Sequence, residues 1–365
     1  MRAALGTRDL NRALLHRQML LERRRMRPLR AIERLVALQA QAPKDPYVGL
    51  WSRLERFRPA ALSDDIADRR AVRMPLLRAT LHLVTARDAL ALRPLVEPAL
   101  QRTLHAQSPY GRRLAGLDVK KLVVTAARLL EERPRTRAEL APLLQERWPH
   151  HDGSSLAYAV TYLLPLVQVP PRGLWGRSGP AAFTTLQGWL AQAPGPGGPL
   201  DPMILRYLEA LGPATPADLR TWSGVRGVNE MLDRLRPRLR TFRDDHGREL
   251  FDTRRAPLPD PDTPAPVRFL PEYDNALLAH ADRGRIVPSG IRWWTEVGWG
   301  TVLVDGFVAA RWRLGRRTSP RSLTIEPFRR LTRSERAEIA EEGSRLGSFL
   351  AGDRGSGPVD ISLTS

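Results

Sequence analysis

Apolar residues recur at helical spacing in the middle of the chain, and the pattern then changes to alternation. Residues 136–148 predict a helix that begins at a capping box, in which Glu139 follows Thr136 by three positions. Residues 153–167 predict a second helix, and residues 167–186 predict two short strands around a turn. Helix, helix and hairpin in this order are typical of a winged helix.

The same order of elements occurs again after a segment rich in proline and glycine, residues 191–200, which we interpret as a linker. Thr215 is expected to cap the middle helix of this copy, with Pro216 at its first position. The elements expected are helices over 202–212, 213–224 and 228–237 and a hairpin over 238–252.

The two ends of the chain are patterned differently. Near the N-terminus, helical spacing predicts helices over 10–25 and 61–72, the second capped by Ser63. Residues 72–85 then alternate as strands, so a diverged unit of the same kind fits there. From residue 267 onward we expect a β-rich module with an Asp-Gly hairpin turn and a closing helix.

These elements indicate an α+β, mainly helical protein with tandem winged-helix units. We expect an N-terminal helical or diverged winged-helix unit over 1–115, winged-helix units over 116–190 and 201–262 joined by the linker 191–200, and a C-terminal β-rich module with its closing helix over 263–365.

The net charge points to a polyanionic partner. The chain of 365 residues carries 58 lysine and arginine residues against 39 acidic ones, for a net charge of +19, and only Lys44, Lys120 and Lys121 are lysines. Arginine binds phosphate oxygens bidentately and stacks on bases, so nucleic acid is the expected partner. The alternative is a GC-rich genome, which accounts for the ratio of arginine to lysine but not for the net surplus.

Several kinds of chemistry have no support in the sequence. The chain has no cysteine, no phosphate-binding glycine loop, no dinucleotide-binding fingerprint and no nucleophile elbow. Its seven histidines never adopt the spacing of a metal site. We therefore expect no metal and no nucleotide cofactor. No signal peptide or membrane span is apparent either, so we expect a cytoplasmic protein.

Two glutamines close together stand out as candidate catalytic groups. Residues 35–38 predict the end of a buried helix, and Gln39 and Gln41 follow on either side of one alanine. Pro43 disfavours helical backbone before it, so the two side chains are expected to straddle a helix end and point the same way. Two neutral amides can hold a water beside a developing oxocarbenium ion when the leaving group already carries positive charge. The alternative, that they cap a helix end and face solvent, stays open.

Five blocks in the chain resemble a known family, the bacterial winged-helix DNA glycosylases of the AlkZ and YcaQ type. The blocks are LVALQAQAPKDPYVGLWSRL, LRATLHLVTARDA, LLPLVQVPPRGLWG, VRFLPEYDNALLAH and VLVDGFVAARWRL. The resemblance implies a C-shaped arrangement of tandem winged helices around duplex DNA and metal-free, monofunctional excision of N-alkylated bases. It also implies that Gln39-Ala40-Gln41 is the Gln-apolar-Gln motif of the AlkZ type, which acts on bulky adducts and crosslinks, whereas the YcaQ type has an aspartate in place of Gln41.

Other residues are candidates for contact with the lesion or with DNA. Tyr47, Trp51, Arg78 and His82 are candidates for the lesion pocket, with Arg78, Thr80 and His82 on one strand face. The alternatives are core packing for Tyr47 and Trp51 and a buried His82. The turn containing Arg172, Trp175 and Arg177 is expected to probe a groove with Trp175 exposed, unless Trp175 folds back on its own domain. Phosphate contacts are expected within the set Arg226, Arg234, Arg236, Arg238 and Arg240. For residues 272–275 we expect only an Asx-type turn.

Three classes of protein are compatible with these features. A DNA glycosylase acting as a monomer on duplex DNA with alkylated bases of the N7-guanine or N3-adenine type is favoured. A winged-helix transcription regulator and a non-catalytic protein that binds damaged DNA are the alternatives. The glutamine pair favours the glycosylase over the two alternatives, because only a glycosylase gives the two side chains a chemical role.

Overall fold

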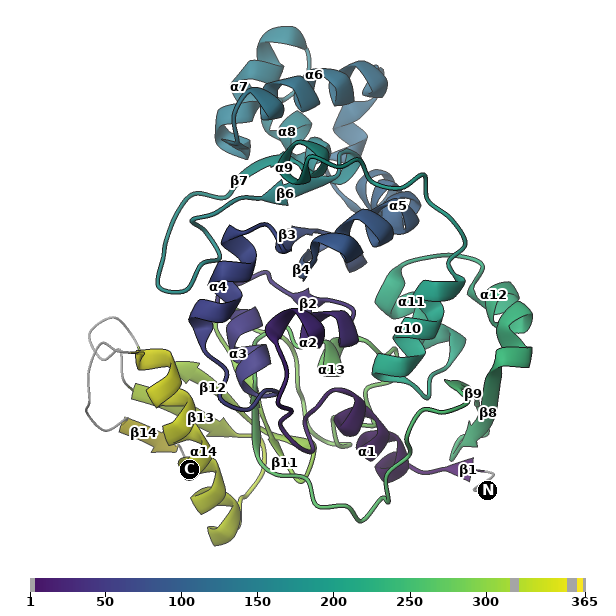
Figure 1. Ribbon diagram of the computed structural model, residues 1–365, viewed down its shortest axis with the longest axis vertical. Coiled ribbons are helices and arrows are strands. Elements are labelled where there is room, and N and C mark those ends of the chain that lie inside the picture. The colour runs from purple at the N-terminus through teal and green to yellow at the C-terminus, as the bar shows by residue number, and fades with distance from the viewer. Residues whose placement is uncertain (1–3, 316–321, 353–359, 364–365) are drawn as a thin grey trace.

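The computed structural model describes residues 4–315, 322–352 and 360–363. Within these ranges the strands form three sheets, with helices packed around them (Figure 1).

A six-stranded sheet connects the N-terminal region with the segment that follows it. Its strand order is β2-β4-β3-β6-β7-β5, so β2 lies at an edge. Arg73 of β3 pairs with Gln168 of β6, and the sheet thereby crosses the boundary expected at residues 115 and 116. The strands are β2 (Leu38–Gln39), β3 (Ala71–Pro75), β4 (Leu81–Thr85), β5 (Arg135–Thr136), β6 (Leu166–Gln168) and β7 (Ala182–Thr185).

The N-terminal helices are shorter than the sequence pattern suggested. The helix expected over 10–25 ends at Arg17, because Met19 has a positive φ of 56°. The helix expected over 61–72 begins at Pro59, so Ser63 lies inside it and is not its cap. These helices are α1 (Thr7–Arg17), α2 (Pro28–Arg34), α3 (Asp45–Trp51) and α4 (Pro59–Ala67).

The segment over 116–190 has the expected order of helix, helix and hairpin. The capping box of Thr136 and Glu139 is present at the start of α7, as predicted. Leu140, Leu144 and Leu156 lie in a core between the helices, and strands β6 and β7 pair antiparallel after them. The helices of this segment are α6 (Val119–Glu132), α7 (Arg137–Arg147), α8 (Gly153–Leu163) and α9 (Leu186–Leu190), and α5 (Ala86–Arg102) precedes it.

The second copy of this order also forms as predicted. Thr215 caps α11 in a capping box with Asp218, and Pro216 is its first residue. The N-terminal strand β1 (Ala4–Leu5) adds to the hairpin by pairing parallel with β8. The other elements are α10 (Asp201–Leu211), α11 (Pro216–Ser223), α12 (Val228–Leu235), β8 (Leu239–Asp244) and β9 (Glu249–Thr253).

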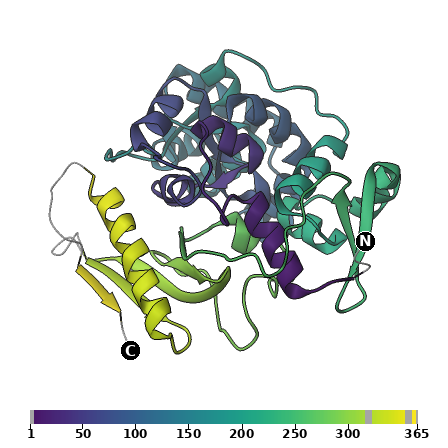
Figure 2. The ribbon, with the colours of Figure 1, turned by 60° about the horizontal axis from the view of Figure 1, so that its bottom comes forward.

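The C-terminal module is a sheet of five strands in the order β10-β11-β12-β13-β14, and α14 lies across it (Figure 2). The predicted Asp-Gly turn joins β11 and β12, with φ values of 45° at Asp305 and 80° at Gly306. The elements are β10 (Arg268–Leu270), α13 (Asn275–Leu278), β11 (Gly300–Val304), β12 (Phe307–Leu314), β13 (Ser322–Pro327), α14 (Arg333–Ala351) and β14 (Asp360–Leu363).

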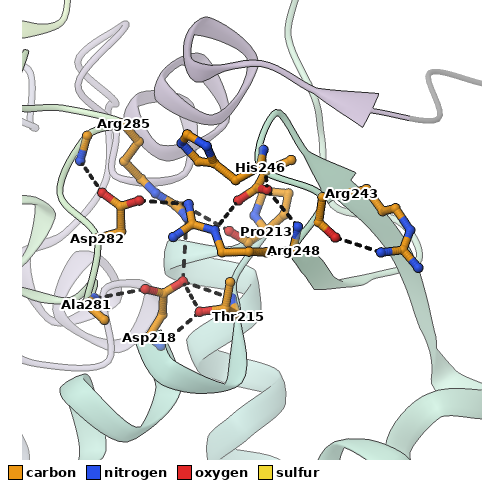
Figure 3. A network of polar contacts seen from close by, with 12 residues as sticks. Pro213, Thr215, Asp218, Arg243, His246, Arg248, Ala281, Asp282 and Arg285 are labelled. Carbon is orange, nitrogen blue, oxygen red and sulfur yellow. Dashed lines mark hydrogen bonds and ion pairs between the residues drawn. The ribbon is translucent and has the colours of Figure 1, made fainter.

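A polar network fastens α11 and the β8–β9 hairpin to the segment that follows α13 (Figure 3). Asp218 of α11 lies 3.6 Å from Arg285, and both side chains are buried. Arg248 of the hairpin donates to Asp282 at 2.7 Å. The network therefore joins parts of the chain that are far apart in sequence.

Candidate active site

The side chains of Gln39 and Gln41 project from the same face of the edge strand β2 and of the residues that directly follow it. Leu38 and Ala40 are buried in the core formed with α2, α3 and α4. Gln39 pairs with His82 of β4, and the Ala40 backbone N–H donates to the Leu81 carbonyl at 2.8 Å. Because side chains alternate along a strand, Gln39 and Gln41 face away from that core. The extended backbone expected between them is present, but they lie on a strand, and the helix before them ends at Arg34.

The amide of Gln39 is held in one orientation. Its Oε1 accepts a hydrogen bond from Arg78 Nη2 at 2.8 Å, and the same nitrogen donates to Asn275 Oδ1 at 3.0 Å. Asn275 Nδ2 in turn donates to the Ala37 carbonyl at 2.7 Å. An arginine nitrogen can only donate, so the oxygen of Gln39 must face Arg78 and its NH₂ group must point away.

Gln41 is held less firmly. Its side chain is exposed, and its Oε1 accepts from the Leu81 backbone N–H at 3.3 Å. A carbonyl oxygen has a second lone pair, so Gln41 keeps an acceptor available for water or substrate. The site thus combines one fixed amide with one exposed amide.

Arg78 does not lie on a strand face, contrary to expectation. It lies in the 3-10 turn Leu77–Ala79 between β3 and β4, with φ 52° and ψ 21°, while His82 lies on β4. Burial lowers the pKa of Arg78 to about 10, so the guanidinium remains charged at neutral pH. Its Nη1 is buried and has no hydrogen-bond partner among the described residues.

His82 lies in register with Gln39 and is completely buried. Its Nδ1 donates to the Thr80 carbonyl at 3.0 Å. Burial, with Arg78 as the second cause, lowers the pKa of His82 to about 3, so the ring is neutral at neutral pH. His82 is therefore the buried histidine that was the alternative to a lesion-pocket residue, and it does not line an open pocket.

The three aromatic residues considered for the lesion pocket or the DNA belong to one aromatic cluster that includes Phe349. The ring of Trp175 lies 4.9 Å from that of Tyr47 and 5.2 Å from that of Phe349. Trp51 stacks on Phe349 as well, at 5.8 Å. Tyr47 is buried and donates to the Gly173 carbonyl at 2.8 Å. Tyr47 is buried, and Trp51 and Trp175 are half-buried, between α3, α14 and the β6–β7 loop. These contacts correspond to the alternatives considered from sequence, core packing for Tyr47 and Trp51 and a folded-back Trp175, and not to an exposed Trp175.

Some of the arginines expected at DNA phosphates already have protein partners. Arg236 pairs with Glu249 at 2.8 Å, and Arg240 pairs with Asp252 at the same distance. Arg172 donates to the carbonyl of Gly179 in its own loop at 3.2 Å. Arg234 is likewise paired, with Asp201 at 2.5 Å.

Arg177, Arg226 and Arg238 are exposed and have no side-chain partner within the described ranges. An exposed, unpaired guanidinium is available to a phosphate without breaking an ion pair. These three are therefore the better candidates for contact with DNA.

The sequence pattern missed several residues beside the glutamines. Asn275 was expected only in an Asx-type turn; Asp274 does cap α13, but Asn275 contacts Arg78. Arg73, a lone arginine in an apolar strand, donates to the Ala40 carbonyl at 2.6 Å. Burial, and then Glu272, raise the pKa of Asp45 to about 8, so Asp45 holds its proton at neutral pH.

No group of three or more His, Asp or Glu side chains in the described part of the chain is placed to hold a metal ion. None of the described helices is long and apolar enough to cross a membrane.

Comparison with known proteins decides the family. The family model described as DNA glycosylase AlkZ-like matches residues 32–349, a span that includes both glutamines, Arg78 and Asn275. The chain belongs to the AlkZ-like DNA glycosylase family. Family membership decides among the three classes of protein considered from sequence, and the chain is a DNA glycosylase that binds DNA.

A solved structure supports the same fold. The DNA glycosylase AlkZ of Streptomyces sahachiroi is similar over 99% of this chain and 100% of its own, with a TM-score of 0.71 and 20% sequence identity. The comparison with curated proteins gives no match. At this identity the AlkZ structure shows the fold alone.

Proposed function

We propose that this glycosylase hydrolyses the N-glycosidic bond of N-alkylated purines in duplex DNA, with Gln39 and Gln41 as its catalytic residues. The observation that carries the proposal is the arrangement of the two amides on one face of an edge strand, one fixed by Arg78 and one exposed. Alkylation at N7 of guanine or N3 of adenine makes the base cationic. Neutral amides suit such a substrate, because its base already carries the positive charge that makes it a good leaving group. No charged side chain is needed to activate it.

The chemistry needs no proton from the protein. When the bond between C1′ and the base breaks, the base takes both electrons and leaves as a neutral molecule, and the sugar becomes an oxocarbenium ion. A water that accepts from the NH₂ group of Gln39 and donates to the carbonyl of Gln41 keeps one lone pair free to attack C1′. The water loses its proton to solvent after attack, and the product is an abasic site in an intact strand.

The proposed architecture around the DNA takes the winged helices from the order of elements and the C-shaped arrangement from the family resemblance. The units α6–α8 with β6–β7 and α10–α12 with β8–β9 are each proposed to be winged helices, arranged as a C around the duplex. The exposed arginines Arg177, Arg226 and Arg238 are proposed to bind phosphates. A monomer is sufficient for this arrangement. Bulky or crosslinked adducts are proposed as substrates, since Gln41 stands where the YcaQ type has an aspartate.

The test is base release from a duplex that contains one N7-alkylguanine, read out as cleavage at the abasic site. The Gln39→Ala/Gln41→Ala double variant is expected to lose about 100-fold or more of the single-turnover rate, because groups that stabilise developing charge contribute on that scale. Duplex affinity and thermal stability are expected to stay near wild type. Gln187→Ala, which changes an exposed glutamine on α9, is the matched control.

A wild-type rate in the double variant would refute the role of the glutamines. Tight binding of the lesion duplex without base release, repeated with a bulky adduct and a crosslink, would refute the proposed substrate class.

A further inference from the structure

The amide of Gln39 is the end of a chain of hydrogen bonds that starts at the backbone of its own segment. Ala37 accepts from Asn275, Asn275 accepts from Arg78, and Arg78 donates to Gln39, over distances of 2.7, 3.0 and 2.8 Å. Asn275 is 5% exposed and Gln39 is 7% exposed. The two amides are therefore shielded from water while Arg78 is partly exposed, and each member limits the movement of the next.

An isolated glutamine amide has little preference between its two orientations. Rotation by half a turn about its last bond exchanges the oxygen and the NH₂ group, and this torsion is broad and roughly two-fold. The exchange would place a hydrogen-bond acceptor where the bound water needs a donor. Some group must therefore exclude the wrong orientation, and a charged donor does so most firmly because it cannot accept a hydrogen bond.

We infer that Arg78, backed by Asn275, is the positioning residue that fixes the amide of Gln39 with its NH₂ group toward the damaged nucleotide; the inference rests on the proposed function. Arg78 touches no reacting atom in this role. It acts by holding the oxygen of Gln39 and by polarising the amide, which makes the NH₂ group a stronger donor.

The backbone at Arg78 supports a functional role over a purely structural one. Arg78 and Ala79 are consecutive non-glycine residues with φ values of 52° and 56°. Positive φ is unfavourable for residues that carry a side chain, and backbone strain of this kind is found preferentially at functional sites. Arg78 also has no carboxylate partner within the described ranges, and its Nη1 is buried without a hydrogen bond. A turn that served folding alone would favour glycine or asparagine at these positions.

The competing explanation is that Arg78 binds a DNA phosphate directly. The two roles differ in what they control, because a phosphate contact contributes to affinity and to its salt dependence. A positioning contact controls the rate at which the bound complex reacts.

The experiment compares Arg78→Met and Arg78→Lys with the control Arg283→Met. Arg283 is an exposed cation near enough to lower the pKa of Arg78, and it makes no bond to Gln39. The single-turnover rate at saturating enzyme, duplex affinity at several salt concentrations and thermal stability are measured for each. A second readout is the ¹H–¹⁵N NOE of the Gln39 side-chain NH₂ group, assigned by its loss in Gln39→Ala.

Arg78→Met is expected to lower the rate about 10- to 100-fold, the range typical of residues that orient a catalytic group from behind. Arg78→Lys is expected to recover part of that loss, and Arg283→Met to leave the rate unchanged. Duplex affinity is expected to stay within about 2-fold of wild type. The NOE of Gln39 is expected to fall to that of a mobile side chain in Arg78→Met.

An unchanged rate in Arg78→Met, or a loss of affinity and salt dependence with the rate intact, would overturn the inference. An ordered Gln39 amide in Arg78→Met would overturn it as well. If wild type releases no base from any duplex but the Gln39 amide loses order in Arg78→Met, the proposed function fails and the positioning contact stands. Should Arg78→Met fail to fold, the NOE of the Gln39 side-chain NH₂ group is measured in Arg78→Lys instead, and an NOE equal to that of wild type would overturn the inference.

Discussion

Replacing Asp218 by alanine is expected to destabilise the protein more than a change at any exposed helix cap. Asp218 is 2% exposed and accepts from the Thr215 backbone N–H at 2.8 Å, the Thr215 hydroxyl at 2.9 Å and the Ala281 backbone N–H at 2.8 Å. It also faces the guanidinium of Arg285 at 3.6 Å (Figure 3). Alanine removes all of these contacts together and leaves Arg285 buried.

The expected loss has two parts. Removing a capping side chain costs about 1 kcal/mol. Removing one partner of a buried ion pair costs about 3 to 5 kcal/mol, because the other charge remains in the interior. We therefore expect the free energy of unfolding to fall by roughly 4 to 6 kcal/mol.

The assay is urea denaturation at pH 7 followed by circular dichroism, with Glu139→Ala as the control. Glu139 completes the capping box of α7 on the exposed surface, so its loss removes the same motif without burying a charge. A loss below about 1 kcal/mol for Asp218→Ala would refute the argument, since it would mean that the buried pair contributes no more than the cap alone.

The pH dependence gives an independent check of the same reasoning. Burial opposes ionisation of Asp218, but His280, then Arg285 and the backbone N–H groups of Thr215 and Ala281, outweigh it and hold the pKa of this carboxyl below its usual value. The stabilisation is therefore present above about pH 4, the ordinary aspartate pKa, and is lost as the pH falls through the lowered folded-state pKa. The difference between wild type and Asp218→Ala is expected to shrink in acid.

Two further predictions concern charge. Asp45 has its pKa raised to about 8, so the folded state keeps a proton that the unfolded state releases, and wild-type stability should fall as the pH rises from about 4 to 8. In Asp45→Asn the melting temperature is expected to depend less on pH across this range. An unaltered dependence on pH would contradict the buried proton. Arg238→Ala is expected to reduce the slope of log affinity for duplex against log salt by about 1, whereas Arg240→Ala, whose side chain is paired with Asp252, is expected to leave it nearly unchanged. Equal slopes in the two variants would mean that the pairing does not decide which arginine contacts phosphate.

Local signals in the sequence predicted most of the elements correctly. The capping box at Thr136, the helix cap at Thr215 and the Asp-Gly turn at Asp305 each depend on contacts within a few residues, and all three form as expected. The order of helix, helix and hairpin followed from the same local patterns. The sharing of one sheet between the first two segments could not, because the pairing of Arg73 with Gln168 joins strands from distant parts of the sequence.

The sequence likewise predicted the local features of the candidate site but not its tertiary contacts. The common direction of Gln39 and Gln41 follows from strand alternation and was predicted, while their support by Arg78 and Asn275 depends on tertiary contacts and was not. For Trp175 the sequence left two alternatives open, a side chain that faces DNA and one that folds back on its own domain. Aromatic partners from α3 and α14 hold it half-buried, and neither helix is near it in sequence.

Ala40 accounts for the spacing of the motif in physical terms. Alternation on a strand sends any residue between two functional side chains into the opposite face, and Ala40 is fully buried in the core there. A polar residue at this position would lack a partner in that core, and a much larger apolar residue would push β2 away from α2 and α3. Arg73 also donates to the carbonyl of Ala40 and so fixes the backbone between the two glutamines, while Arg78 fixes the side-chain amide of Gln39. The apolar middle position is therefore the anchor that allows two side chains on an edge strand to keep one geometry.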